Sequence, residues 1–236
     1  MNHQFQNLSL IHDSKRVRLA MTSGRIFEIL RQAIIQLELK PGTVLSEAEI
    51  ARQFGVSRQP VREAFIKLSE INLLEIRPQR GTFVCLISIH EVETARFLRE
   101  AIEIAIVRKA AECASSSDTL LLKTNIAAHK ALSSYDHKEF HRLDEEFHHI
   151  IAKCADCEDA WRILVSLKVQ MDRVRFLALT SQAFPIDMIV LQHEKIGRAL
   201  ENRNAEAAVN AMYEHLNEIQ DSLPKLSLEF PDFFSE

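Results

Sequence analysis

The sequence predicts a mainly α-helical chain of two domains, the first with a short sheet beside its helices and the second an all-α antiparallel bundle. Three observations support this fold class. The 236 residues are ample for two hydrophobic cores. Four of the five glycines lie before residue 88, so tight turns are concentrated there. After residue 88, apolar residues recur every three to four positions, as on one face of a helix. We expect domains at residues 17–87 and 88–223, flanked by a flexible tail at 1–16 and a C-terminal tail at 224–236.

The formal charge divides between these two domains. The whole chain carries a net charge of −4, but residues 1–87 hold 12 Lys and Arg against 8 Asp and Glu, a net of +4. The remaining 17 Lys and Arg and 25 Asp and Glu leave the rest at −8. A basic first domain suits a polyanion such as DNA, because each contact releases condensed counterions. The chain shows neither a secretory leader nor an apolar run near the ~20 residues that span a bilayer, so we expect a cytoplasmic protein without membrane contact.

Two helices are predicted before the most informative part of the first domain. The first spans residues 26–39 and is stopped by Lys40-Pro-Gly42. The second begins at Ser46, which forms a capping box with Glu49, and ends at Gly55, which favours a left-handed backbone. The core-facing residues of the first helix are Ile29, Leu30, Ala33, Ile34 and Leu37.

A third helix follows after a tight turn and is capped by Ser57. Its apolar stripe consists of Val61, Ala64, Phe65 and Leu68. This stripe leaves Arg58, Gln59 and Arg62 exposed at the start of the helix, which is how a helix-turn-helix reads the major groove of DNA. An ordinary helical hairpin with a solvated basic face is the alternative interpretation.

A basic hairpin completes the first domain. Two short strands, residues 73–77 and 82–87, flank a turn that needs the conformational freedom of Gly81. The hydrogen-bond donors at its tip are Arg77, Gln79 and Arg80. Such donors suit phosphates or the minor groove, so the whole domain is predicted to be a winged helix-turn-helix.

Three stretches of this domain carry a known pattern. They read Lys-Pro-Gly-Thr-Val-Leu-Ser-Glu at 40–47, Val-Ser-Arg-Gln-Pro-Val-Arg-Glu-Ala at 56–64 and Arg-Pro-Gln-Arg-Gly-Thr-Phe-Val at 77–84. Together they resemble the DNA-binding domain of the GntR family of bacterial transcriptional regulators, over about residues 17–87. The resemblance implies that Arg58 contacts an operator guanine and Arg62 the DNA backbone. It further implies phosphate or base contacts from Ser57 and Gln59, and a wing tip at Arg80 and Gly81.

The second domain is predicted to be a helical bundle. Its expected helices span residues 92–114, 118–134, 136–154, 159–179, 185–202 and 204–223. The breaks at 156–158 and 202–204 are short, so neighbouring helices should pack antiparallel. The aromatic segment 230–234 is expected to dock on a helix.

Cysteines give a weak indication of function. Cys154 and Cys157 have CxxC spacing, but they stand alone, without a second pair. We expect reduced, half-buried thiols, with a redox or zinc role as the less favoured alternative.

Histidines give a stronger indication. Asp144 and His148 lie four residues apart on one predicted helix, so they share a face. His193 and His215 lie on the last two predicted helices, which an antiparallel turn would place side by side. One carboxylate and three imidazoles suit zinc or another divalent first-row cation. Ordinary hydrogen-bonded histidines are the alternative.

Residues 90–222 resemble the FCD effector domain of the FadR-type branch of the GntR family. The resemblance implies that the metal ligands are Asp144, His148, His193 and His215. The metal would be a divalent transition metal, zinc first, with nickel or manganese as alternatives. The sequence Arg99-Glu-Ala-Ile-Glu103 matches the branch's Arg-x-x-Leu-Glu, so Arg99 is expected to hold the carboxylate of a small organic acid. His149 is not expected to be a ligand.

Together these features predict a homodimeric, ligand-responsive repressor that binds a short palindromic operator in double-stranded DNA. A metal that is purely structural, or that is itself the signal, is the alternative. A metal-dependent hydrolase is disfavoured because His193-Glu194 lacks the second histidine of His-Glu-x-x-His. We therefore do not expect an enzyme.

Overall fold

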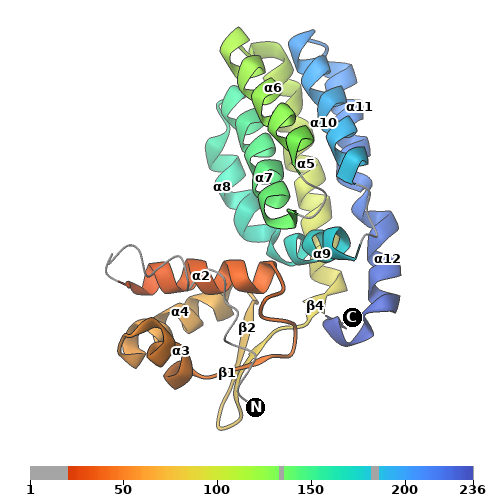
Figure 1. The fold of residues 1–236 in the computed structure, drawn as a ribbon. Helices are drawn as coiled ribbons and strands as arrows, with labels where there is room; N and C mark the ends of the chain where they lie inside the picture. The colour runs from red at the N-terminus through yellow and green to blue at the C-terminus, as the bar shows by residue number, and fades with distance from the viewer. Residues whose placement is uncertain (1–20, 133–135, 182–185, 236) are drawn as a thin grey trace. The chain divides into compact units, whose positions relative to one another are not determined.

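The residues described by a computed structural model are 21–132, 136–181 and 186–235 (Figure 1). The tail expected at residues 1–16 lies outside them. The chain divides into two units, of which the first runs to Ser88 and includes the segment from Phe230, whereas the second spans Ile89–Glu229. The predicted fold class, a winged helix-turn-helix with an all-α bundle, is confirmed.

Helix α2 (Ser23–Ile35) begins and ends earlier than the predicted range of 26–39. It begins earlier because the side chain of Thr22 caps its first turn. It ends earlier because Leu37 has a left-handed φ of 55°, which a helix cannot continue through. The predicted core residues Ile29 and Leu37 are only half-buried. The buried residues are Ile26, Leu30, Ala33, Ile34 and Ile35.

The helix-turn-helix consists of α3 (Glu47–Phe54) and α4 (Arg58–Glu70). Ser46 caps α3 by accepting a hydrogen bond from the backbone N of Glu49 at 3.4 Å. The predicted capping box is only half formed, since the Glu49 carboxylate bonds Arg52 instead. Gly55 ends α3 in the left-handed conformation, at φ 66°, as predicted. Ser57 lies at the N-cap of α4 but makes no capping bond with its side chain.

The sheet of the first unit has three antiparallel strands in the order β1-β3-β2. These are β1 (Val44–Leu45), β2 (Leu74–Arg77) and β3 (Gly81–Val84). In the turn between β2 and β3, the backbone N of Arg80 donates to the carbonyl of Arg77 at 3.1 Å. Both Gln79 (φ 59°) and Gly81 (φ 108°) have a positive φ there. The turn therefore needs a positive φ at two residues and not at the glycine alone.

A second small sheet corrects two predictions. The strand expected at 82–87 ends at Val84, and β4 (Ile87–Ser88) follows as a separate strand. It pairs in parallel with β5 (Phe234–Ser235). Phe234, the last residue of the aromatic segment 230–234, therefore docks by pairing with Ile87 of a strand, whereas docking on a helix was expected.

Five long helices of the second unit run side by side (Figure 1). They are α5 (Ile89–Cys113), α6 (Ser116–Ala131), α7 (His137–Cys154), α10 (Ile186–Glu201) and α11 (Ala205–Asn217). Contacts pass from α5 to α11, α10, α6, α7 and back to α5, so the helices close a ring. Central residues of the core are Val107, Phe147, Ile196 and Met212. Within the described residues, no helix combines the length and the apolar composition that crossing a membrane requires.

The helix predicted at 159–179 is two helices, α8 (Glu158–Leu167) and α9 (Val169–Thr180). Lys168 lies at the junction and is fully buried. Its ammonium bonds Glu145 of α7 at 2.5 Å and Asp172 of α9 at 2.7 Å. A charge buried at a helix junction leaves no trace in apolar periodicity, so the sequence pattern suggested one continuous helix.

The helix predicted at 204–223 is also two helices, because α11 ends at Asn217 and α12 (Ile219–Glu229) follows. Pro224 lies inside α12 without ending it. The C-terminal tail was predicted to begin at residue 224, but α12 continues to Glu229. The tail therefore begins six residues later than predicted.

Candidate functional site

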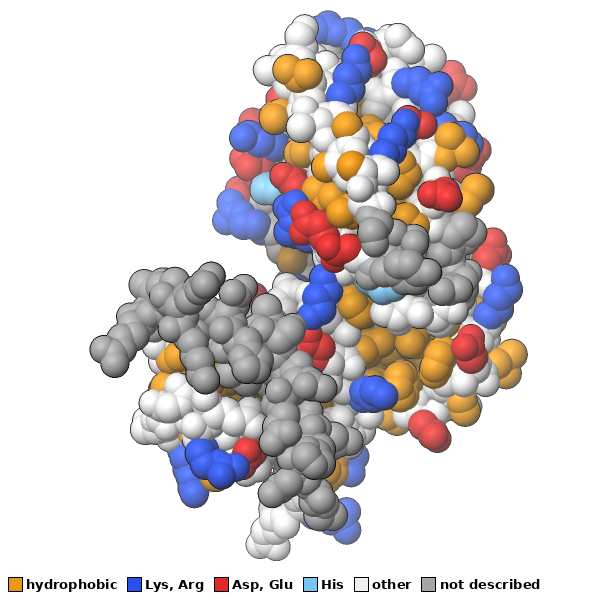
Figure 2. Space-filling view, in the orientation of Figure 1, with side chains coloured by type: hydrophobic (Ala, Val, Ile, Leu, Met, Phe, Trp, Pro, Cys, Tyr) orange, Lys and Arg blue, Asp and Glu red, His pale blue; other side chains and the backbone are white. Residues whose placement is uncertain are grey.

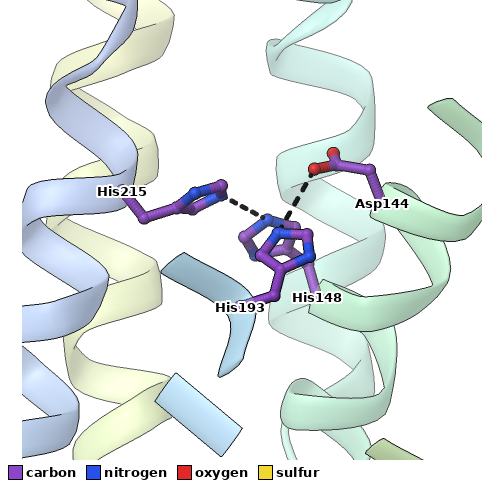
Figure 3. A group of neighbouring side chains, drawn as sticks. All are labelled: Asp144, His148, His193 and His215. Atoms are coloured by element: carbon purple, nitrogen blue, oxygen red, sulfur yellow. Dashed lines mark hydrogen bonds and ion pairs between the residues drawn. The ribbon is translucent and has the colours of Figure 1, made fainter. Parts of the chain in front are cut away.

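Four buried side chains from three helices converge inside the bundle (Figure 3). Helix α7 supplies Asp144 and His148, α10 supplies His193 and α11 supplies His215. One ligand atom from each lies within 4.8 Å of the others, and none of the four residues is more than 5% exposed. We call this group the Asp–His cluster. It contains the same four residues that the sequence analysis predicted to bind a metal.

Local structure explains how three helices contribute to the cluster. On α7, the four-residue spacing places the aspartate and the first histidine on the buried face. Helices α10 and α11 are joined by a tight turn in which Arg203 has a φ of 52° and Asn204 caps α11. The turn brings the rings of His193 and His215 to within 4.8 Å, centroid to centroid.

His148 is oriented by a carboxylate. Its Nδ1 lies 2.5 Å from Glu103 Oε2, and its Nε2 lies 2.9 Å from Arg99 Nη2. Burial would raise the pKa of Glu103, but the charges of Arg99 and His148 lower it to about 2. An ionised Glu103 favours a proton on Nδ1 of His148, whereas Nε2 lies against both the Arg99 guanidinium and the cluster.

His215 is oriented in the same way by an amide. Its Nδ1 donates to Gln192 Oε1 at 2.9 Å, and Gln192 Nε2 donates to Glu218. Burial, followed by the nearby imidazoles, holds the pKa of His215 well below its usual range, so the ring is neutral. Its Nε2 also carries a lone pair, and this atom faces Nε2 of His148 at 3.1 Å.

His193 is packed but unpaired. Its ring stacks on Phe147 with centroids 3.9 Å apart, and burial lowers its pKa to about 4. Neither ring nitrogen makes a hydrogen bond with the described residues, although Nε2 lies 3.4 Å from Asp144 Oδ1. A buried polar group without a partner is costly, which suggests a ligand.

Asp144 is paired with Arg175 of α9, whose Nη2 lies 2.7 Å from the carboxylate. Burial would raise the pKa of Asp144, but Arg175 and the neighbouring histidines hold it well below its usual range. Arg175 was not predicted from the sequence. It lies 31 residues from Asp144 on a helix with no recognisable motif, so no pattern in the sequence joins the two.

The donor set of the Asp–His cluster fits a divalent cation. One carboxylate and three neutral imidazoles are ligands that zinc and other first-row metals accept. The ring nitrogens of the buried His193 make no hydrogen bond with the described residues, and a bound cation would give one of them a partner. The groups behind the histidines, Glu103 and Gln192, complete the usual second layer of a metal site.

A cavity of about 40 Å³ adjoins the cluster. Polar side chains that line it include Arg99, His141, Asp144, Arg175, Gln192 and His215. Arg99, the predicted effector ligand, therefore lies at the expected place. It is only 4% exposed and also binds Glu103, so part of its hydrogen-bonding capacity is already used.

Three other groups lie apart from the cluster. His149 is half-exposed and lies 3.6 Å from Glu158. Cys154 and Cys157 are free thiols at the junction of α7 and α8. Burial raises the pKa of Cys154 to about 11, which makes it a poor nucleophile. A second group with ligand-like spacing consists of His141, Glu145 and Asp172. The buried ammonium of Lys168 already supplies the positive charge for its two carboxylates.

The predicted DNA-reading residues lie on the first turns of α4 and are exposed. Arg62 binds Glu47 of α3 at 3.2 and 3.3 Å, and Gln59 donates to Glu63 at 3.1 Å. Within the described part of the chain, the side chain of Arg58 makes no hydrogen bond or ion pair. Lys and Arg side chains are visible on this unit in the space-filling view (lower left in Figure 2).

The wing presents its residues differently. Arg77 lies over the ring of Phe83, 4.6 Å from its centroid, and pairs with Glu75 at 2.6 Å. Arg80 and Gly81 are exposed at the tip, and the Arg80 side chain bonds none of the described residues. The start of α4 and the wing tip, both predicted to contact DNA, thus each present one arginine whose side chain bonds none of the described residues.

Comparison with known families gives two matches. Residues 22–84 match the family described as bacterial regulatory proteins, gntR family, and residues 95–218 match the FCD domain. The second match alone covers more than half of the chain.

Similar proteins share both parts. The chain is 41% identical over 213 residues to the HTH-type transcriptional repressor RspR of Escherichia coli strain K12, covering 90% of this chain and 93% of the relative. A solved structure of E. coli McbR/YncC has a TM-score of 0.74 at 19% identity and covers 90% of this chain and 100% of its own. A putative transcriptional regulator GntR from Rhodococcus sp. RHA1 has a TM-score of 0.69 at 25% identity, covering 86% and 96%.

Proposed function

The chain belongs to the GntR family of bacterial transcriptional regulators and carries an FCD domain, and we propose that it is a metal-containing repressor that responds to a small carboxylate. Its relatives are DNA-binding regulators and not enzymes. The observation that carries the metal part of the proposal is the convergence of four buried ligand atoms within 4.8 Å, together with a fully buried His193 whose ring nitrogens make no hydrogen bond with the described residues.

DNA recognition is assigned to both regions of the first unit. Arg58 donates two hydrogen bonds to a guanine edge, because its guanidinium is exposed and has no partner among the described residues. Arg62 leaves its ion pair with Glu47 and binds a phosphate of the DNA backbone. Further phosphate or base contacts come from Ser57, Gln59, Arg77, Arg80 and Gly81. A homodimer presents two such units to the two halves of a palindrome.

Effector binding is assigned to the Asp–His cluster and its cavity. The cluster holds a divalent transition metal, with zinc first and nickel or manganese as alternatives. When bound, the metal supplies an electrophilic centre for a carboxylate oxygen. Arg99 donates a charge-assisted hydrogen bond to the same carboxylate. Glu103 and Gln192 hold the two histidine rings in place by fixing their Nδ1 protons.

Coupling between the two units follows from linkage. An effector changes operator affinity only to the extent that it binds the DNA-competent and DNA-incompetent conformations with different affinity. A structural metal is the second candidate role, and the small cavity of about 40 Å³ favours it.

Two measurements on the purified full-length chain test this proposal. Metal analysis should find one divalent ion per chain, and fluorescence anisotropy with an operator selected from random duplex DNA should detect sequence-specific binding. Small carboxylates should then change operator affinity in the metal-loaded protein and not in the Arg99→Ala variant. A loaded protein that binds its operator but ignores every acid points to the structural metal, and a protein that takes up no metal overturns the metal site.

A further inference from the structure

The chain crosses between its two units twice. It leaves the first unit at Ser88, where α5 begins, and it returns to that unit after Glu229, where α12 ends. The returning segment, residues 230–235, belongs to the first unit, and there β5 pairs in parallel with β4. We call residues 230–235 the C-terminal strap. The proposed function gives this segment no role.

The strap is held to β4 by a small contact. Two pairs of residues make up the ladder, Ile87 with Phe234 and Ser88 with Ser235. The side chain of Ile87 is fully buried and that of Phe234 is 9% exposed, so one aromatic ring supplies most of the apolar contact. A pairing this short can be either formed or released, and a ligand can supply the free-energy difference between the two states.

Helix α12 leads from the cavity beside the Asp–His cluster to the strap. Ile219 and Ser222 of its first turn line that cavity, as does Glu218 immediately before the helix. Leu223 and Leu226 are buried, and the helix packs against α9. Its 11 residues form a continuous helix about 16 Å long. A displacement of the first turn is therefore carried to the last turn, where the strap begins.

Two hydrogen bonds connect a proposed metal ligand to the start of this helix. His215 Nδ1 donates to Gln192 Oε1 at 2.9 Å, and Gln192 Nε2 donates to the carboxylate of Glu218. A metal bound at Nε2 of His215 would fix the ring on its opposite side, and Gln192 and Glu218 would lose freedom with it. The occupancy of the cluster thus acts on the first turn of α12.

We propose that the C-terminal strap couples the Asp–His cluster to the DNA-binding unit, with metal at the cluster favouring the paired state of β5. This inference rests on the proposed function, in which the cluster holds a divalent metal. Only Cys85 and Leu86 separate β4 from strand β3 of the wing, and α5 follows β4 directly. A paired strap therefore restrains the joint at which the winged unit is attached. Such an element, whose two states both ligands bias, is what coupling between sites requires.

Hydrogen exchange tests the first step on the full-length wild type, chelator-treated and zinc-loaded. The amides of residues 230–235 should exchange more slowly in the zinc-loaded protein, by about 5-fold or more, because β5 spends more time paired. This measurement needs no substitution, so it decides the first step whether or not a variant folds.

Phe234→Ala tests the second step, because it removes the buried ring of the strap. Coupling is reciprocal, so this variant should bind zinc about 5-fold more weakly or worse in competition with a chelator, although Phe234 does not line the cavity. Zinc should change the operator affinity of the wild type by a comparable factor in fluorescence anisotropy. It should leave the operator affinity of Phe234→Ala unchanged.

Leu228→Ala is the matched control. It also truncates a large apolar side chain close to the strap, but Leu228 is 83% exposed. Its zinc affinity and its operator response to zinc should equal those of the wild type. If it behaves like Phe234→Ala, the effect is not specific to the pairing of β5, and the proposal is wrong.

The remaining outcomes are equally decisive. Equal exchange of the strap with and without zinc overturns the proposal, as does a zinc effect on operator affinity that survives in Phe234→Ala. Slower exchange without any zinc effect on the operator shows that the strap responds to the cluster but transmits nothing, which also overturns the coupling. A wild-type chain that takes up no zinc fails at the earlier stage, because the metal site of the proposed function is then wrong.

Discussion

Arg58 and Arg99 place the same guanidinium group in opposite environments. Arg58, at the start of α4, the helix proposed to read DNA, is exposed and bonds none of the described residues. Arg99, inside the bundle, is 4% exposed and held between Glu103 and His148. An exposed cation costs little on folding and remains available for a distant polyanion, whereas a buried cation must be paired in the folded state.

The difference shows how each region can respond to its ligand. The DNA-reading face carries separate charges whose effects add, so single substitutions there should weaken binding by limited factors. The buried site is a connected network, in which Glu103 orients His148, Gln192 orients His215 and Arg175 holds Asp144. Removing one member should therefore change the properties of the others.

The largest expected effect is the loss of metal from the buried network. His193→Ala removes a fully buried ligand and should abolish stoichiometric metal retention and any response to acids. Operator binding should persist, because the winged unit has its own core. Elemental analysis and anisotropy measure the two properties. His149→Ala, which alters a half-exposed histidine, is the matched control, and metal loss in that variant would contradict the ligand assignment.

The next largest effect is expected on the exposed face. Arg58→Ala should lower operator affinity by about 1–3 kcal/mol and remove the preference for one base pair. Arg80→Ala should weaken all duplexes similarly and reduce the slope of log affinity against log salt by about 1. Anisotropy titrations over a salt series with operator variants distinguish these outcomes. If Arg58→Ala kept its base preference, the placement of the recognition helix would be wrong.

These two regions also differ in how far the sequence could predict them. In the region proposed to read DNA, Gly55, Ser57 and Arg58 lie within a few positions of one another in the sequence. Turn and helix signals are therefore enough to predict where they lie. On α7 the spacing of Asp144 and His148 is equally local. The agreement at these positions follows from helix geometry alone.

Hydrogen-bond partners that lie far apart in the sequence were not predicted. Arg175 approaches Asp144 from a helix 31 residues away, and Gln192 approaches His215 from 23 residues away. The junction at Lys168 was missed for the same reason, because a buried ion pair interrupts an apolar pattern without changing it. Periodicity reports which face is buried, but it does not report which charged groups meet there.

A third prediction concerns the pH dependence of the metal-free protein. Burial lowers the pKa of His193 from 6.5 to about 4, so between these values the unfolded chain binds a proton that the folded chain does not. The free energy of unfolding should therefore fall as the pH drops from about 6.5 to 4, by up to about 3 kcal/mol from this group. Urea unfolding of the chelator-treated protein across this range measures it, with His193→Gln as the comparison. An identical slope in both proteins would mean that His193 is not the titrating group.

The smallest expected effect concerns Arg62. This residue is exposed, as Arg58 is, but it is already paired with a carboxylate, as Arg99 is. It binds Glu47 at 3.2 and 3.3 Å, with 59% and 29% of the two side chains exposed. Such a surface pair contributes little to stability, yet it must break before Arg62 reaches a phosphate. Glu47→Gln should therefore raise operator affinity by about two- to five-fold, with the larger gain at low salt. Glu28→Gln removes the same charge from an exposed position of α2 and controls for overall charge. A loss of affinity in Glu47→Gln would show instead that Glu47 holds Arg62 in the orientation that DNA binding needs.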